Sequence, residues 1–434
     1  MAIRPIRYEL DLSLDFDRRR LEGEVVLEVR NDGPDAVADV PLLLNRRLRV
    51  ERAAPGLRVD QAVVPVAGLP AMEINQVLVG LPEPLPPGGT TRLGFRYAGG
   101  IGDYVATGMR YIRDRIDPSF TIVRMDAHAY PVLGVPDLAV LRAADRPAFD
   151  WRARIDVQVG LVAACGGRPT GTTGTTGTTG RAVHTFESLR PSWRMDFAIA
   201  PFETLSRGDL RVHHLPGDGA GAARVLRGVE DAFRLFSEWF GPLLDPSPFT
   251  VIEIPDGWGS QADVTCILQT AAAFRDPQRL VEVYHEVSHL WNPPDLDRPS
   301  PRLNEGLATF LQYEIADRLD RTSRREDAVA RTIARLRERR GEDEMLREVP
   351  FADYGRAGRT DLSYTVGLLL FDALERRVGT EAFRALVGGF YRTCAARGAR
   401  TEDFVRLAVE TAGADLEAFF REWLFTTAWT GRLC

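Results

Sequence analysis

Residues 285–289 read His-Glu-Val-Ser-His, and a second segment, LNEGLATFLQYEI at 303–315, begins shortly after them. On a helix, His285 and His289 lie one turn apart on one face, so both imidazoles can reach a single metal ion. Glu286 projects beside them, where a carboxylate can accept a proton from water. Because HExxH also occurs in ordinary amphipathic helices whose histidines are only hydrogen-bonded, these five residues alone leave both interpretations open.

The second segment supplies a third candidate ligand. Fifteen residues separate His289 from Glu305. Apolar residues then recur every four positions, which predicts a helix with Glu305 in its first turn: Leu307, Leu311, Ile315 and Leu319. Two histidines and one glutamate leave a fourth position open, which is typical of a catalytic zinc site. We therefore expect one Zn²⁺ per chain, held by His285, His289 and Glu305, although cobalt or manganese suits the same donors.

At these residues the sequence resembles the gluzincin peptidases, and within them the aminopeptidase N and leukotriene A4 hydrolase family. HEVSHLWN is similar to the family's HExxHxW signature, and LNEGLATF is similar to its WLNEGFA segment. The family usually has eighteen residues where this chain has fifteen, in a connection, NPPDLDRPSPR, that holds four prolines. Because NEG still begins a helix, we expect a shortened loop that keeps the ligand.

A third segment, DLSYTVGLLLFDALERRVGTEAF at 361–383, is similar to the family's tyrosine helix. The resemblance implies that Tyr364 hydrogen-bonds the oxyanion of the tetrahedral intermediate. The alternative is a packing role, in which Tyr364 belongs to the buried face of a helix with Val366, Leu369 and Leu370.

The family's amine-binding motif, GxMEN, is altered in this chain. The corresponding stretch reads IPDGWGSQADVTCIL at 254–268, and neither register places a glutamate at the motif position. With Gly259 as the motif glycine, Ala262 takes that position; alignment on the flanking residues gives Asp263 instead. Asp263 is our candidate for pairing with a substrate ammonium, and an ordinary loop carboxylate is the alternative.

Composition excludes several other chemistries. The chain has no lysine, so its 55 basic residues are all arginine, and Schiff-base enzymes and Walker P-loops are ruled out. A net charge of −6 with both signs interspersed gives no basic stripe for nucleic acid. The N-terminus lacks the continuous apolar core of a signal peptide, and no stretch has the apolar length to span a bilayer. We therefore expect a cytoplasmic protein without membrane or nucleic-acid partners.

The predicted fold class is multidomain α+β. In residues 1–205, polar and apolar residues alternate as they do in strands, and this part resembles the family's saddle-shaped all-β domain. The tract GTTGTTGTTG at 171–180 is expected to be a low-complexity loop between strands. Residues 206–434 are expected to form a thermolysin-like zinc catalytic domain, with an α/β lobe at 206–325 and a helical lobe at 326–434. The resemblance further implies a short form of the family that lacks a C-terminal helical cap domain.

These observations predict a zinc metallopeptidase, aminopeptidase-like, in which Glu286 is the general base and Tyr364 assists. Its substrate would be a peptide or a small amide. Two alternatives stay open: a zinc hydrolase of a non-peptide or specialised substrate, and a non-catalytic interaction module on a peptidase fold. The altered motif around Gly259 and Asp263 leaves the choice between aminopeptidase and endopeptidase undecided.

Overall fold

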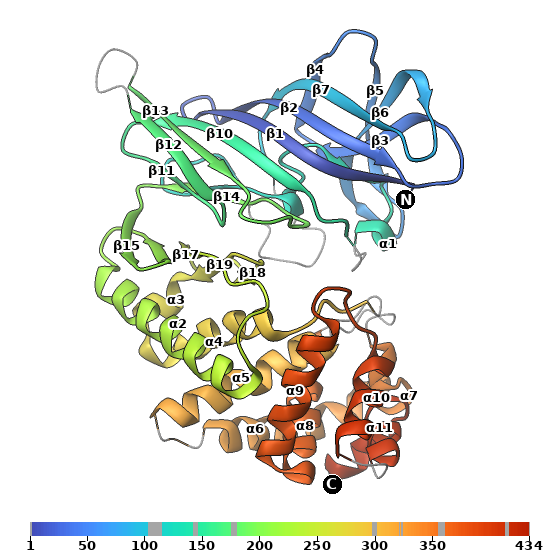
Figure 1. Cartoon of the computed structure of the whole chain (residues 1–434), viewed down its shortest axis with the longest axis vertical. Helices are drawn as coiled ribbons and strands as arrows, with labels where there is room; N and C mark the ends of the chain where they lie inside the picture. Colours follow the sequence, from blue (N-terminus) through green and yellow to red (C-terminus); the bar gives the residue numbers. More distant parts are fainter. Residues whose placement is uncertain are drawn as a thin grey trace. The chain divides into compact units, whose positions relative to one another are not determined.

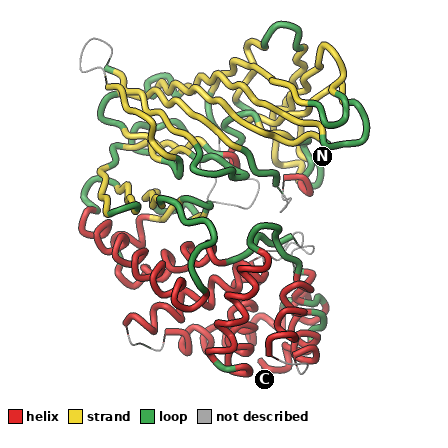
Figure 2. Tube along the Cα trace, viewed as in Figure 1, coloured by secondary structure: helices red, strands yellow, loops and turns green. Residues whose placement is uncertain are grey.

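The computed structural model describes residues 2–102, 115–141, 146–174, 180–296, 302–320, 322, 324–354, 361–412 and 416–433. Strands fill the N-terminal part of the chain and helices the C-terminal part, which confirms the α+β prediction (Figures 1 and 2). The chain forms two compact units: Met1–Arg142, Arg146–Ala223 and Ser247–Arg275 make the first, and Ala143–Asp145, Arg224–Pro246 and Asp276–Cys434 make the second. The domain boundary expected at residue 205 follows sequence periodicity rather than contacts and stays a prediction.

A seven-stranded sheet dominates the first unit. Its strand order is β12 (Arg168–Gly174), β13 (Arg181–Glu187), β10 (Asp150–Gln158), β1 (Ile3–Asp15), β2 (Arg20–Asn31), β7 (Thr90–Gly99) and β4 (Leu48–Ala53). Strand β1 runs parallel to β10 and antiparallel to β2. Along β1, Leu10, Leu12 and Leu14 are buried and the residues between them are half-buried, because successive side chains of a strand point to opposite faces.

Three smaller sheets complete the first unit. They are β5 (Arg58–Val66), β6 (Leu69–Leu85), β3 (Val37–Asn45) and β9 (Val132–Leu133); β11 (Val162–Ala164), β14 (Phe197–Ala200) and β8 (Thr121–Val123); and β15 (Glu203–Arg207), β16 (Leu210–His214), β17 (Phe249–Ile254), β19 (Cys266–Thr270) and β18 (Gln261–Ala262). Side chains of the seven- and four-stranded sheets share one apolar core. In the five-stranded sheet β16, β17 and β19 are parallel, and the antiparallel strand β18 forms one edge.

The glycine-threonine tract is only partly a loop. Strand β12 continues through its first residues to Gly174, where Thr172 pairs with His184 and Thr173 with Val183 of β13. Threonine is β-branched and favours strands, and this preference outweighs the glycines at that end of the tract. Residues 175–179 lie outside the described part of the chain.

Helices form the second unit, into which α2 (Gly219–Phe240) continues from the first. They are α4 (Leu280–Ser288), α5 (Arg302–Asp320), α6 (Arg324–Glu342), α7 (Glu344–Glu348), α8 (Asp361–Val378), α9 (Thr380–Cys394), α10 (Thr401–Ala412) and α11 (Leu416–Leu424), with 3₁₀ turns η3 (Pro277–Arg279), η4 (His289–Trp291), η5 (Phe351–Asp353) and η6 (Ala428–Leu433). Besides the start of α2, the described helices of the first unit are α1 (Leu138–Leu141), η2 (Met125–Ala127) and α3 (Ala271–Arg275).

Helix α5 packs between α4 and α8, and a glycine pair brings α5 and α8 close together. A Cβ atom built on Gly306 would lie 2.7 Å from the Cα of Gly367. The absence of side chains at this crossing lets the two backbones touch and places the first turns of α5 and α8 beside each other.

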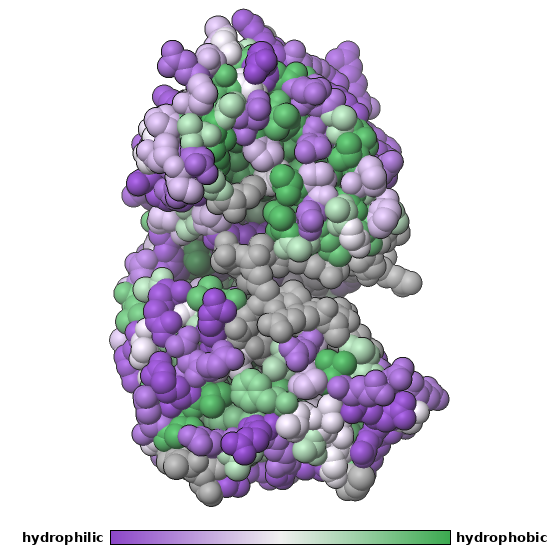
Figure 3. All heavy atoms as spheres, turned by 90° about the vertical axis from the view of Figure 1, so that its right-hand side faces the viewer, coloured by the Kyte–Doolittle hydropathy of each residue, from purple (hydrophilic) through white to green (hydrophobic). Residues whose placement is uncertain are grey.

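In the part of the chain described here, no helix is both long and apolar enough to cross a bilayer. On the face drawn in Figure 3, hydrophilic residues cover much of both units, with apolar residues between them.

Candidate metal centre

The structure brings together the three predicted ligands. One donor atom from each of His285, His289 and Glu305 lies within 4.8 Å of the other two. Nε2 of His285 is 3.1 Å from Oε2 of Glu305, and Nε2 of His289 is 3.6 Å from the same oxygen. Both histidines come from the end of α4 and its continuation η4, and Glu305 comes from the first turn of α5, as predicted.

The end of α4 is fixed against the rest of the second unit. Trp291, which follows the second histidine, is fully buried and donates its indole N–H to the carbonyl of Gly241 at 2.9 Å. Its ring packs on Phe233 and Phe236 of α2. The α-helical segment ends at Ser288, and His289 begins a 3₁₀ turn, yet the two imidazole centroids remain 5.0 Å apart. The tighter last turn therefore does not separate the ligands.

Two carboxamides that the sequence analysis did not single out contact the outer nitrogens of the imidazoles. Oε1 of Gln312 lies 2.9 Å from Nδ1 of His285, and Oδ1 of Asn304 lies 2.7 Å from Nδ1 of His289. A carbonyl oxygen only accepts, so each Nδ1 carries the proton and each Nε2 keeps its lone pair for a metal. The signal in the sequence was a carboxamide just before Glu305 and another on the same helical face seven residues after it.

Electrostatics of the cluster suit a cation. Burial raises the pKa of Glu305, but the nearby His289 and His285 and a hydrogen bond from Tyr364 outweigh burial and lower that pKa to about 2. Burial lowers the pKa of His289, which favours the neutral imidazole that a metal ligand needs. Burial also acts to lower the pKa of His285, but the hydrogen bond and charge of Glu305, together with Glu286, outweigh burial and raise that pKa, so zinc must displace a proton there. Two imidazoles and one carboxylate, all buried or half-buried, are a donor set that fits Zn²⁺.

Glu286 lies beside the cluster without being part of it. Its side chain is buried, and burial raises the pKa of Glu286 to about 8, with Glu305 contributing in the same direction. A carboxylate with a raised pKa is a stronger base than an ordinary one, which is the property expected of a general base.

Tyr364 lies over His285 from the first turn of α8. Its ring is nearly parallel to the imidazole, with centroids 5.9 Å apart, and its hydroxyl bonds the Glu305 carboxylate. The residue is 41% exposed, whereas Val366 and Leu369 of the same helix are buried. Tyr364 thus faces the metal ligands and does not serve the packing face.

Gly259 and Asp263 belong to the first unit, next to the edge strand β18. Oδ1 of Asp263 accepts hydrogen bonds from Ser192 Oγ and from the backbone N–H of Val264, both at 2.7 Å. Strand β18 itself is held by the buried Arg194, whose Nη2 lies 2.8 Å from Oε1 of Gln261. The contact of Gly259 and Asp263 with a substrate amine stays a prediction.

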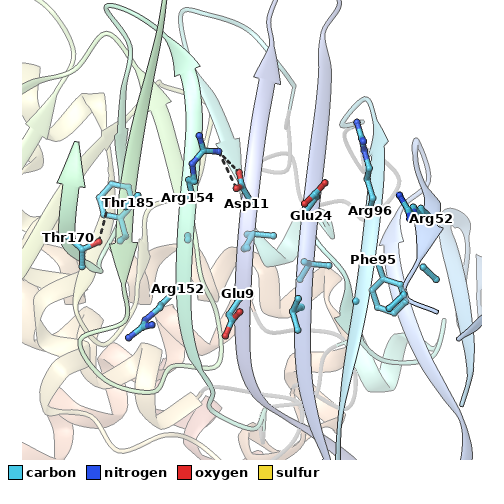
Figure 4. Close-up of a pocket in the computed structure, with 18 of the residues that line it drawn as sticks. Glu9, Asp11, Glu24, Arg52, Phe95, Arg96, Arg152, Arg154, Thr170 and Thr185 are labelled. Atoms are coloured by element: carbon cyan, nitrogen blue, oxygen red, sulfur yellow. Dashed lines mark hydrogen bonds and ion pairs between the residues drawn. The ribbon is translucent and has the colours of Figure 1, made fainter. Parts of the chain in front are cut away.

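A hollow of about 730 Å³ lies elsewhere in the first unit, on the outer face of the seven-stranded sheet. Figure 4 shows charged side chains that rise from neighbouring strands of this face. Arg154 donates to both oxygens of Asp11, at 2.9 and 3.1 Å, and Thr170 donates to Thr185 at 3.0 Å. Charges of opposite sign pair across the strands, as on an ordinary solvated sheet, and we assign this hollow no function.

Comparisons with known proteins show which fold this is. No family model and no curated protein matches the sequence. The crystal structure of an M1 zinc metallopeptidase from Deinococcus radiodurans has a TM-score of 0.70 and 22% identity, over 97% of this chain and 93% of that chain. A mutant M1 zinc metallopeptidase from the same organism, bound to a Tyr-Ser-Ala substrate, has a TM-score of 0.69 and 22% identity, over 98% of this chain and 94% of that chain. A two-domain M1 zinc metallopeptidase mutant bound to L-arginine has a TM-score of 0.69 and 22% identity, over 97% of this chain and 94% of that chain. The likeness establishes a shared fold over nearly the whole chain.

Proposed function

We propose that this chain is a zinc-dependent metallopeptidase with aminopeptidase-like specificity. The observation that carries the proposal is the convergence of His285, His289 and Glu305 on one point, with Glu286 beside them. The shared fold supports it, because the similar structures are described as zinc metallopeptidases, one of them with a peptide substrate. Membership of the aminopeptidase N and leukotriene A4 hydrolase family, suggested by the sequence motifs, is part of the same proposal.

The residues of the site divide the work of amide hydrolysis. His285, His289 and Glu305 would hold zinc, and zinc bound there supplies the Lewis acidity that activates water and polarises a carbonyl. Glu286 takes the proton from the attacking water and passes it to the leaving amine. The hydroxyl of Tyr364 donates a hydrogen bond to the oxygen that gains negative charge.

Recognition of the N-terminus would fall to the segment around Gly259 and Asp263. Oδ1 of Asp263 is engaged by Ser192 and Val264, while Oδ2 makes no hydrogen bond to any residue described here. A carboxylate fixed by one oxygen can present the other to an ammonium group. We therefore infer that Asp263 pairs with the free amine of a peptide.

Mass spectrometry of peptide mixtures tests this function. The zinc-loaded chain would be incubated with peptides that carry a free or an acetylated N-terminus. We expect removal of N-terminal residues from the free peptides, at least about 10³-fold slower for Glu286→Gln, which keeps the zinc but lacks the base. Glu338→Gln removes an exposed carboxylate of α6 as a matched control and should cleave like wild type. Zinc-loaded wild type that cleaves no peptide, or a Glu286→Gln variant at full rate, overturns the proposal.

A further inference from the structure

We propose that Asn304 and Gln312 position the two histidine ligands, and that the neutral carboxamide of Gln312 keeps the zinc affinity below what a carboxylate there would give. The inference rests on the metal of the proposed function, not on its substrate. It requires zinc at His285, His289 and Glu305, whatever molecule is hydrolysed.

The two supports and one ligand come from a single helix. Asn304 directly precedes Glu305, and Gln312 follows Glu305 by seven residues, two turns along the same face of α5. Asn304 meets His289, the later histidine, and Gln312 meets His285, the earlier one. The two helices therefore run antiparallel at the metal centre, and one rigid element sets the orientation of both imidazoles.

Neither acceptor carries a charge, and this limits the zinc affinity of the centre. Histidine ligands commonly donate their second N–H to a carboxylate, a backbone carbonyl or water, and a carboxylate raises the basicity of the ring. Here each ring donates to a side-chain amide, 2.9 Å away for His285 and 2.7 Å away for His289. The carboxylate two residues beyond Gln312, Glu314, is bound by Arg325 at 2.7 Å. The ring of His285 therefore has an orienting partner that adds no negative charge.

Competition with a chelator of known zinc affinity, applied to the full chain, measures the effect. Gln312→Glu keeps the shape and adds the charge, so zinc should bind about 10-fold more tightly. Gln312→Leu removes the acceptor at similar volume, so zinc should bind roughly 10- to 100-fold more weakly. Gln278→Glu adds the same charge at an exposed position of the same unit and should bind zinc like wild type.

Opposite shifts for the two Gln312 variants distinguish an electronic role from simple packing. If both variants weaken zinc binding equally, or neither changes it, the proposal is wrong. Thermal unfolding of the metal-free proteins shows whether each variant folds, and Asn304→Asp, expected to tighten zinc in the same way through His289, replaces any that does not. If the wild type cleaves peptides but the Gln312 variants bind zinc as tightly as the wild type does, this inference alone is wrong. The expected zinc shifts without any cleavage overturn the peptidase alone, and a wild type that binds no zinc overturns both.

Discussion

At the scale of single residues, a substitution at Tyr364 can distinguish a catalytic role of its hydroxyl from a packing role of its ring. Tyr364→Phe keeps the ring that stacks on His285 but removes the hydroxyl. We expect kcat to fall about 10²-fold with KM and zinc content nearly unchanged, because the lost hydrogen bond acts in the transition state. Steady-state kinetics and metal analysis measure both. Tyr391→Phe, which removes a hydroxyl that accepts from the backbone of Leu244, is the control and should keep kcat. A Tyr364→Phe enzyme with unchanged kcat contradicts the assigned role.

Asp263 offers a second residue-scale prediction. Asp263→Asn keeps an oxygen for Ser192 and Val264 but loses the charge that would attract an ammonium group. We expect kcat/KM for peptides with a free N-terminus to fall roughly 10- to 100-fold, since a hydrogen bond to a charged group contributes about 1.5–3 kcal/mol. Acetylated peptides serve as the internal control. An equal loss on both kinds of peptide would assign Asp263 a structural role.

How far single residues can be predicted from sequence depends on the distance over which their partners act. His285, Glu286 and His289 were predictable because one helical turn fixes their spacing. Asn304 and Gln312 were not singled out because their contacts depend on the antiparallel pairing of α4 with α5, which no local spacing encodes. The orientation of Tyr364 likewise became clear only with α8 in place.

At the scale of elements, the crossing of α5 and α8 determines whether Glu305 and Tyr364 can meet. Gly306→Ala would place a methyl group 2.7 Å from the Cα of Gly367 and force the helices apart. We expect a loss of about 1–3 kcal/mol in the free energy of unfolding, together with weaker zinc binding. Denaturant titration and chelator competition measure the two effects.

The matched control is Gly341→Ala in α6, where a Cβ atom meets nothing within 4 Å. Alanine is the better helix former, so this variant should gain up to about 0.5–1 kcal/mol and leave zinc affinity unchanged. If Gly306→Ala behaves like Gly341→Ala, the close approach of α5 and α8 is not needed for the centre.

Element types followed from periodicity where the pattern was long. The helix expected to carry Glu305 in its first turn is confirmed as α5, and the helix expected within 361–383 is confirmed as α8. The extension of β12 into the glycine-threonine tract was missed because pairing with β13, a tertiary effect, overrides the low strand propensity of glycine.

At the scale of the whole molecule, buried ionisable groups make stability depend on pH in two directions. Burial lowers the pKa of His213 to about 3, with Arg211 adding to the effect. Between this value and 6.5 the unfolded chain binds a proton that the folded chain does not, so stability falls as the pH falls through that window. Glu253 acts at higher pH and in the opposite direction: its pKa is raised in the folded chain, so stability falls as the pH rises.

The prediction that isolates the alkaline effect is Glu253→Gln. Glu253 is fully buried, and burial together with Asp218 raises its pKa from 4.5 to about 8. Between these values the folded chain holds a proton that the unfolded chain has lost, so wild-type stability declines as the pH rises from about 4.5 to 8. Allowing for screening by Arg275 and solvent, we expect a decline of roughly 1–3 kcal/mol from this group.

Glutamine has no proton to lose, so the Glu253→Gln variant should show a flatter curve of stability against pH from pH 5 to 8, while keeping the acid-side decline that depends on His213. Denaturant unfolding at several pH values measures both limbs. Equal slopes for wild type and variant above pH 5 would mean that Glu253 is already ionised in the folded protein.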